Sequence, residues 1–116
     1  MTQYLMGIDN GGSEIKSVLF DDQGNQVAAV RRRVEMKMPA PGFTERDADL
    51  VWSANADAIR DTISQAGILP QQIAAIGLTG YGNGICLVDA NGKQTYPCIV
   101  STDSRATSYC RAFRES

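Results

Sequence analysis

The chain has 116 residues, of which 43% are hydrophobic and 21% charged. This composition is that of a globular domain rather than a disordered chain, and no apolar run approaches the roughly 20 residues that a membrane span needs. The formal net charge of −2 disfavours a nucleic-acid backbone as partner, and the lack of histidine excludes Ser-His-Asp triads and histidine-ligated metals.

The first predicted element is an apolar strand from Tyr4 to Ile8, which ends in Asp9. Its nearly continuous apolar run is typical of a strand that is buried on both faces. A glycine-rich turn, Asn10-Gly11-Gly12-Ser13, leads into a second apolar strand from Ile15 to Phe20. Strand, acid, turn and strand together have the form of a hairpin that can bind phosphate.

The chemistry gathered at this turn supports that interpretation. Without a Cβ, Gly11 and Gly12 can take positive φ and direct their amides at phosphate oxygens beside the Ser13 hydroxyl. A carboxylate at Asp9 can hold Mg²⁺ directly or through water, and Lys16 adds a positive charge on the second strand. An ordinary β-hairpin, in which the glycines only form the turn and the acid only caps it, remains an alternative.

A turn over Asp21 to Asn25 precedes a third strand, Gln26 to Val34, which completes an antiparallel meander. Three consecutive arginines, Arg31 to Arg33, favour a solvated edge strand over a nucleic-acid contact. The prolines and the glycine between Lys37 and Thr44 predict a surface loop.

A helix is predicted to begin at Asp47 or Asp49 and to end at Gly67 before Pro70. Trp52, within this helix, is expected to lie in the hydrophobic core of the domain. One helix face is apolar at helical spacing and comprises Val51, Ala54, Ala58, Ile59, Ile63 and Ala66. The fully apolar run from Ile73 to Leu78 then predicts a strand parallel to the first.

The Asn91-Gly92 pair predicts a hairpin between strands at Ile85 to Val88 and Gln94 to Val100. Thr102 or Asp103 can cap a last helix, which has no stop signal before Ser116, so we expect a truncated protein. The cysteines do not form a zinc pattern, and we expect reduced, buried thiols at all three, Cys86, Cys98 and Cys110. The order β-β-β-α-β predicts an α/β fold with a mixed sheet, as in actin-like or ribonuclease H-like ATPase domains.

Four segments in succession resemble the N-terminal part of the FGGY carbohydrate kinase family. GIDNGGSEIKSVLFD is similar to its first phosphate motif and PGFTERDADLVW to the segment before its first helix. IAAIGLTGYGNGICLVDANGK resembles the strand and sugar-contacting loop that follow, and IVSTDSRA resembles an aspartate and arginine segment of xylulokinase-like members, here Asp103 and Arg105. The resemblance covers nearly the whole chain.

The resemblance implies transfer of the γ-phosphoryl group of ATP to a sugar or polyol hydroxyl, with Mg²⁺ as metal ion. Asp9 would organise Mg²⁺ beside the transferred phosphate, while Gly11, Gly12 and Ser13 would line the phosphate turn. Lys16 would offset phosphate charge, or would face solvent as an ordinary strand lysine.

In the same resemblance, Tyr81, Gly82 and Asn83 occupy the sugar-contacting loop, and Asp103 either binds sugar or caps the last helix. Tyr81 is alternatively a packing aromatic at a strand end. In this loop glycerol kinases carry Gln-Arg-Glu and xylulokinases carry Gln-Met-His, and this chain departs from both. The absence of Arg and Glu argues against glycerol, and the similarity around Asp103 favours a ketopentose or a related keto-sugar. The segment Glu45 to Asp47, which precedes the predicted helix, is expected to be structural.

Residues 1–116 are thus expected to be the N-terminal part of the first kinase domain, inactive alone. The resemblance places the catalytic base and the adenine-binding domain beyond Ser116. A non-catalytic actin-like ATPase domain or a sugar-sensing regulator remains the alternative. The expected partner is a small sugar, without nucleic acid or membrane; homodimerisation of the full-length protein stays open. Since the N-terminus also lacks a signal pattern, we expect a cytoplasmic protein.

Overall fold

The computed structural model describes all residues, 1–116, and the chain divides into two compact units. Unit 1 comprises Met1–Val34 and Asp49–Tyr81, and unit 2 comprises Glu35–Ala48 and Gly82–Ser116. Neither helix of the chain is long and apolar enough to cross a membrane.

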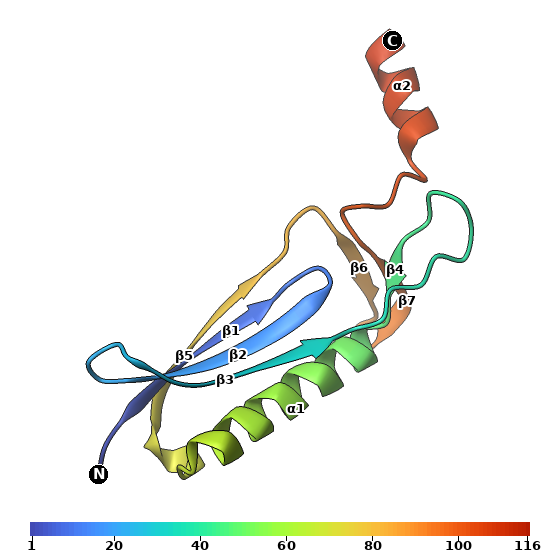
Figure 1. Ribbon diagram of the computed structural model, residues 1–116. Coiled ribbons are helices and arrows are strands. Elements are labelled where there is room, and N and C mark those ends of the chain that lie inside the picture. Colours follow the sequence, from blue (N-terminus) through green and yellow to red (C-terminus); the bar gives the residue numbers. More distant parts are fainter. The chain divides into compact units, whose positions relative to one another are not determined.

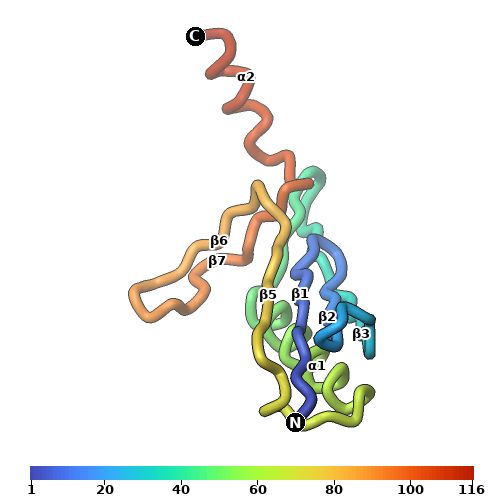
Figure 2. The backbone as a smooth tube through the Cα atoms, turned by 90° about the vertical axis from the view of Figure 1, so that its left-hand side faces the viewer, coloured from blue at the N-terminus to red at the C-terminus, as the bar shows by residue number.

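Unit 1 is built on a four-stranded mixed sheet with the strand order β3-β2-β1-β5. The antiparallel meander consists of β1 (Tyr4–Asn10), β2 (Glu14–Asp21) and β3 (Gln26–Arg33). The fourth strand, β5 (Ile73–Gly80), runs parallel to β1, and Figure 2 shows the two side by side. The predicted meander and the predicted parallel return are both confirmed.

Helix α1 (Ala48–Ala66) lies lengthwise along one face of this sheet (Figure 1). Strand residues Met6, Ile8, Leu19 and Ala28 form a buried cluster on which the helix packs. The predicted apolar face of the helix is confirmed, because all its members belong to the two clusters that link helix and sheet: Val51, Ala54, Ala58, Ile59, Ile63 and Ala66. The helix starts directly after Asp47.

The end of α1 also agrees with the prediction from the sequence. Gly67 takes a φ of 65°, which a glycine adopts without steric cost. A short 3₁₀ turn, η1 (Pro70–Gln72), then leads into β5. Trp52, in contrast, is 75% exposed, so its assignment to the core was wrong. It lies one residue past Val51 and therefore off the apolar face of the helix.

The prediction that β1 is buried on both faces was also wrong. In β1, Met6 and Ile8 are buried, whereas Leu5, on the opposite face, is 49% exposed. In β5, Ile76 and Leu78 are exposed as well. A single helix covers only part of one face of the sheet, so the apolar character of these strands exceeds what unit 1 itself buries.

The arginines of β3 lie at the sheet edge, as predicted. Arg31 forms an ion pair with Glu14 at 3.5 Å, and Arg32 binds Asp61 of α1. Both pairs are largely solvent-exposed and contribute little to stability.

Unit 2 contains a small antiparallel sheet with the order β4-β7-β6. Strands β6 (Ile85–Val88) and β7 (Gln94–Ile99) form the predicted hairpin, whose strands lie side by side in Figure 2. Its turn is closed by Asp89, which accepts hydrogen bonds from the amides of Asn91 and Lys93 at 2.9 Å. The two-residue strand β4 (Glu45–Arg46) was not predicted, because so short a strand has no periodicity to detect.

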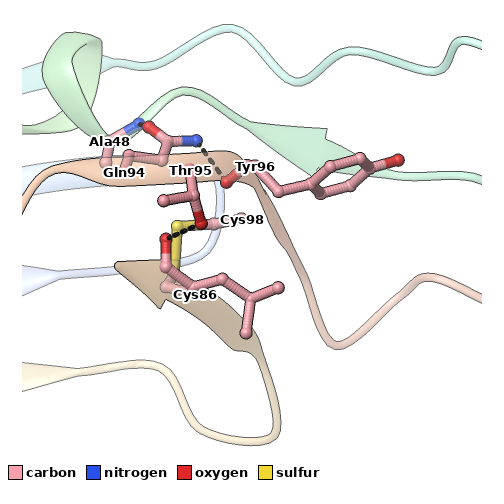
Figure 3. The surroundings of a disulfide bond; sticks show 7 residues. Ala48, Cys86, Gln94, Thr95, Tyr96 and Cys98 are labelled. Atoms are coloured by element: carbon pink, nitrogen blue, oxygen red, sulfur yellow. Dashed lines mark hydrogen bonds between the residues drawn. A yellow bond between two sulfur atoms is a disulfide. The ribbon is translucent and has the colours of Figure 1, made fainter. Parts of the chain in front are cut away.

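Two predictions fail in unit 2. Cys86 and Cys98 form a disulfide between β6 and β7 (Figure 3), and Cys110 is an exposed free thiol, so the expectation of three reduced, buried thiols was wrong. Helix α2 (Thr107–Glu115) starts after Ala106 without a side-chain cap. Neither Thr102 nor Asp103 caps it, because both residues precede the cap position at Ala106 and the carboxylate of Asp103 has other partners.

Candidate functional site

Asp9 lies at the carboxyl end of β1 between side chains of two neighbouring strands. It is paired with Lys16 of β2 in the antiparallel register and with Thr79 of β5 in the parallel register. Residues paired in this way extend their side chains to the same face. The fold therefore creates a row of an amine, a carboxylate and a hydroxyl across three strands.

This row borders an open hollow of about 490 Å³. The next row of paired residues is Val18, Gly7 and Gly77, and it also lines the hollow. Because Gly7 and Gly77 have no side chain, no side chain stands between the hollow and the backbone there, and a ligand can approach the backbone beside Asp9. Alternation along β1 places this surface on the face opposite Met6 and Ile8, away from α1.

The turn Asn10–Ser13 follows directly. Neither Gly11 nor Gly12 takes the positive φ that we expected to be useful there. Gly11 is required for a different reason: a Cβ at this position would lie 2.6 Å from the carbonyl oxygen of Glu14. Gly12 has open space around it, and Ser13 is exposed.

The end of β1 is fixed by the sugar-loop candidate Tyr81 and by Asn55, which sequence reasoning did not identify. The amide of Tyr81 donates to the carbonyl of Asn10 at 3.2 Å, which holds the residue after β5 beside the start of the turn. From α1, the side-chain amide of Asn55 donates to the carbonyl of Val51 at 2.9 Å and reaches Asn10 Oδ1 at 3.5 Å. Tyr81 is thus brought to the phosphate hairpin.

Of the remaining sugar-loop candidates, Gly82 and Asn83 belong to unit 2 and are exposed. Asn83 has a φ of 63°, in the left-handed region, where asparagine is one of the residues most often tolerated. Its exposed side-chain amide can both donate and accept hydrogen bonds.

Asp103 is the centre of a buried ionic cluster in unit 2. Its carboxylate accepts hydrogen bonds from Arg105 Nε at 2.9 and 3.0 Å, from Arg105 Nη2 at 2.7 Å and from the Thr44 amide at 2.7 Å. Its side chain is 3% exposed. These hydrogen bonds, above all those from the Arg105 guanidinium, hold the pKa of the Asp103 carboxyl well below its usual range despite the opposing effect of burial.

Arg105 is shared between several partners. Besides Asp103, its guanidinium donates to Glu45 at 2.9 Å and to the hydroxyl of Tyr96 at 3.3 Å, and it lies 4.0 Å from the centre of the Phe43 ring. The bonds to Asp103 and Glu45 raise the pKa of Arg105 further above its already high value. Glu45 is buried and engaged by Arg105, which is compatible with the structural role expected for its segment.

The residues that sequence reasoning missed have weak or no signals. Thr79 stands in an otherwise apolar strand, and its place beside Asp9 follows only from the β1–β5 register. The partners of Arg105, namely Phe43, Glu45 and Tyr96, are separated from it by up to 62 positions, so no local pattern indicates them.

The donors around Asp9 fit Mg²⁺ better than a metal that needs a complete protein cage. No group of three or more His, Cys, Asp or Glu residues gathers anywhere in the chain. Mg²⁺ is commonly bound by one or two carboxylates together with water and substrate phosphates. One exposed carboxylate beside a hydroxyl and a glycine turn matches this requirement.

Comparison with known proteins agrees with the geometry. Residues 4–116 match the model of the FGGY family of carbohydrate kinases, N-terminal domain. The chain is 42% identical over 103 residues to a probable L-xylulose kinase of Haemophilus influenzae, covering 89% of this chain and 21% of that protein. It is 36% identical over 115 residues to the L-xylulose/3-keto-L-gulonate kinase of Escherichia coli K12, covering 99% and 23%.

Among solved structures, the gluconate kinase of Lactobacillus acidophilus superposes with a TM-score of 0.91 at 23% identity, over 99% of this chain and 23% of that one. This likeness confirms the predicted fold, the mixed-sheet α/β domain of actin-like ATPases. The chain spans between a fifth and a quarter of the length of these relatives.

Proposed function

This chain belongs to the FGGY family of carbohydrate kinases, and from that premise we propose that it is the N-terminal part of an ATP-dependent sugar kinase. The full-length enzyme transfers the γ-phosphoryl group of ATP to a sugar hydroxyl in the cytoplasm. The observation that carries the proposal is the placement of Asp9 between Lys16 and Thr79 at the mouth of the glycine turn.

Each residue of the hairpin has a role that follows from its position. Asp9 holds Mg²⁺, which when bound neutralises charge on the transferred phosphate. The backbone amides of Gly11 and Gly12 and the hydroxyl of Ser13 donate hydrogen bonds to phosphate oxygens. Lys16, which lies in the same row as Asp9 on the neighbouring strand β2, offsets the remaining negative charge. Phosphoryl transfer depends mainly on such positioning and electrostatics.

We assign contacts with the sugar to Tyr81, Gly82, Asn83 and Asp103. The Asn83 amide both donates and accepts, as recognition of a sugar hydroxyl requires. The carboxylate of Asp103 is already engaged by Arg105 and Thr44, so its contribution is to hold the surrounding segment and to offer at most a remaining lone pair. The base that accepts the proton of the sugar hydroxyl is a residue beyond this chain. The 116 residues alone are therefore inactive.

A keto-sugar is the proposed substrate class. The names of both relatives compared above specify L-xylulose, and one of these also specifies 3-keto-L-gulonate. The loop of this chain lacks the Arg and Glu that glycerol kinases carry, which argues against glycerol.

The test is coupled ADP release by the full-length protein with a panel of ketopentoses, polyols and aldonates. We expect Mg²⁺-dependent turnover with a ketopentose or related keto-sugar, and at least tenfold lower kcat/KM with glycerol. Turnover only with polyols would contradict the substrate assignment. Uniform inactivity, with sugar binding retained, would instead support a sugar-sensing protein and contradict the kinase proposal.

A further inference from the structure

We propose that Thr79 is a positioning residue of the magnesium site, and that its hydroxyl holds a water molecule of the hydrated ion next to Asp9. The inference rests on the proposed function, because it concerns the same metal ion. It adds to the site a residue on β5 that is remote in sequence from the phosphate hairpin.

The first support is the register of the sheet. β1 and β5 are parallel neighbours, and Asp9 is paired with Thr79 at their carboxyl ends. Adjacent strands are spaced at about 4.8 Å, so paired side chains on one face can share a small ligand between them. The carboxyl ends of parallel strands are also where open α/β sheets bind their ligands.

The second support is the surface on which both residues lie. Asp9, Lys16 and Thr79 line the same hollow, whose adjacent lining contains Gly7 and Gly77. A Cβ added to Gly77 would meet nothing within 4 Å. The hydroxyl therefore borders an accessible space rather than a packed interior.

The third support is the chemistry of β5. Of the strand sequence IAAIGLTG, Thr79 is the only residue with a polar side chain, and it is exposed. On an open strand face, the other apolar residues do not need a hydroxyl for packing. A threonine here supplies one donor and two acceptor lone pairs at the single row that also contains the carboxylate.

Mg²⁺ binds few protein ligands and keeps several waters, which need partners of their own. One carboxylate alone leaves these waters unoriented. Residues that hydrogen-bond to metal ligands orient them, and their loss typically weakens metal binding about 10- to 100-fold. Thr79 can serve in this way from one side of Asp9, while Lys16 on the other side is a cation and is suited to phosphate.

The experiment compares full-length Thr79→Val, Thr79→Ser and Thr95→Val with the unmodified protein. Valine keeps the β-branched shape and removes only the hydroxyl, and serine restores the hydroxyl. Thr95 is an exposed threonine of β7 that bonds the Leu87 carbonyl at 3.3 Å and serves as the matched control. Binding of Mn²⁺ in the presence of ADP is measured by electron paramagnetic resonance, and circular dichroism melting verifies folding.

We expect Thr79→Val to weaken Mn²⁺ binding about tenfold and to raise the half-saturating Mg²⁺ concentration for turnover similarly. Its kcat at saturating Mg²⁺ should stay within about twofold of the unmodified value, since the metal then still occupies the site. Thr79→Ser and Thr95→Val should bind Mn²⁺ normally. Unchanged Mn²⁺ affinity in folded Thr79→Val would overturn this inference alone. Absence of Mn²⁺–ADP binding in the unmodified protein would instead overturn the proposed function on which it rests.

Discussion

Asp9 and Lys16 lie directly opposite each other on β1 and β2, on either side of the glycine turn. Opposite charges paired across antiparallel strands attract each other, but at an exposed position the gain is small. Beside a turn rich in backbone amides, the two groups can instead bind different parts of a metal–nucleotide complex: the carboxylate binds the metal ion and the amine binds a phosphate. In the proposed site, Asp9 would attract the cation and Lys16 the phosphate.

The first prediction concerns Lys16. In full-length Lys16→Gln, we expect the KM for ATP to rise about two- to fivefold with little change in kcat, as expected for a partly exposed charge that binds ground state and transition state alike. Steady-state kinetics with varied ATP measure this. Lys93→Gln, at the exposed hairpin turn of unit 2, is the control and should leave both parameters unchanged. A Lys16→Gln enzyme with an unaltered KM for ATP would remove Lys16 from the phosphate site.

The second prediction separates the two turn glycines. Gly11→Ala places a Cβ 2.6 Å from the Glu14 carbonyl oxygen, a backbone atom that cannot move freely. We expect this variant to lose about 1–3 kcal/mol of unfolding free energy. Gly12→Ala meets no atom within 4 Å and should change stability by at most about 0.5 kcal/mol. Urea unfolding of the two full-length variants tests the contrast, and equal losses would show that the described turn geometry is wrong.

The third prediction follows from the lowered pKa of Asp103. A carboxyl whose pKa is lower in the folded than in the unfolded chain stabilises the fold above its unfolded value, about 3.9. That stabilisation is lost as the pH falls from about 4 through the lower folded value. Thermal melting of the full-length protein should therefore show no contribution from Asp103 to pH dependence between pH 7 and 5.

Asp103→Asn provides the comparison. The variant should be less stable than the unmodified protein at pH 7, because Arg105 then lacks its main charged partner. The difference in melting temperature between the two proteins should narrow below pH 4. A difference that is constant from pH 7 to 3 would mean that the Asp103 carboxylate contributes no titrating stabilisation.

The fourth prediction concerns a buried hydroxyl under α1. Ser17 is fully buried and its Oγ has no hydrogen-bond partner, whereas the neighbouring hydroxyl of Thr62 donates to the Ala58 carbonyl at 2.7 Å. Removing an unsatisfied buried hydroxyl should not destabilise the fold, so Ser17→Ala should gain up to about 1 kcal/mol. Thr62→Val, which removes a satisfied hydroxyl, should lose about 1 kcal/mol. Chemical denaturation distinguishes them, and destabilised Ser17→Ala would indicate an internal partner for its hydroxyl.

Local patterns sufficed for most of unit 1. The period of α1, the stop at Gly67 and the order of the strands follow from residue spacing and turn chemistry, which are properties of neighbouring residues. The extent of burial does not follow in the same way. Leu5 and Leu78 are as apolar as buried strand residues, yet they are exposed, because burial depends on whether another element covers them.

The site was predictable only in part, for a similar reason. Asp9, Gly11 and Lys16 lie close together in sequence, and the hairpin that joins them is a local feature. Thr79 joins them only through the parallel pairing of β1 with β5. The link between Arg105 and Glu45 likewise spans 60 positions and depends on the packing of unit 2. The disulfide Cys86–Cys98 requires the β6–β7 register, since cysteine spacing alone did not indicate it.

The fifth prediction tests the central claim, that Asp9 organises the metal and phosphate in a sugar kinase. It compares ADP release by full-length Asp9→Asn, by the Asp22→Asn control at an exposed turn, and by the unmodified protein, each with the proposed keto-sugar substrate. We expect Asp9→Asn to lower kcat about 10²- to 10³-fold, while sugar affinity, measured by calorimetry, stays within about threefold. Asp22→Asn should be normal. If Asp9→Asn released ADP at the unmodified rate, the assignment of this hairpin as the magnesium and phosphate site would be contradicted.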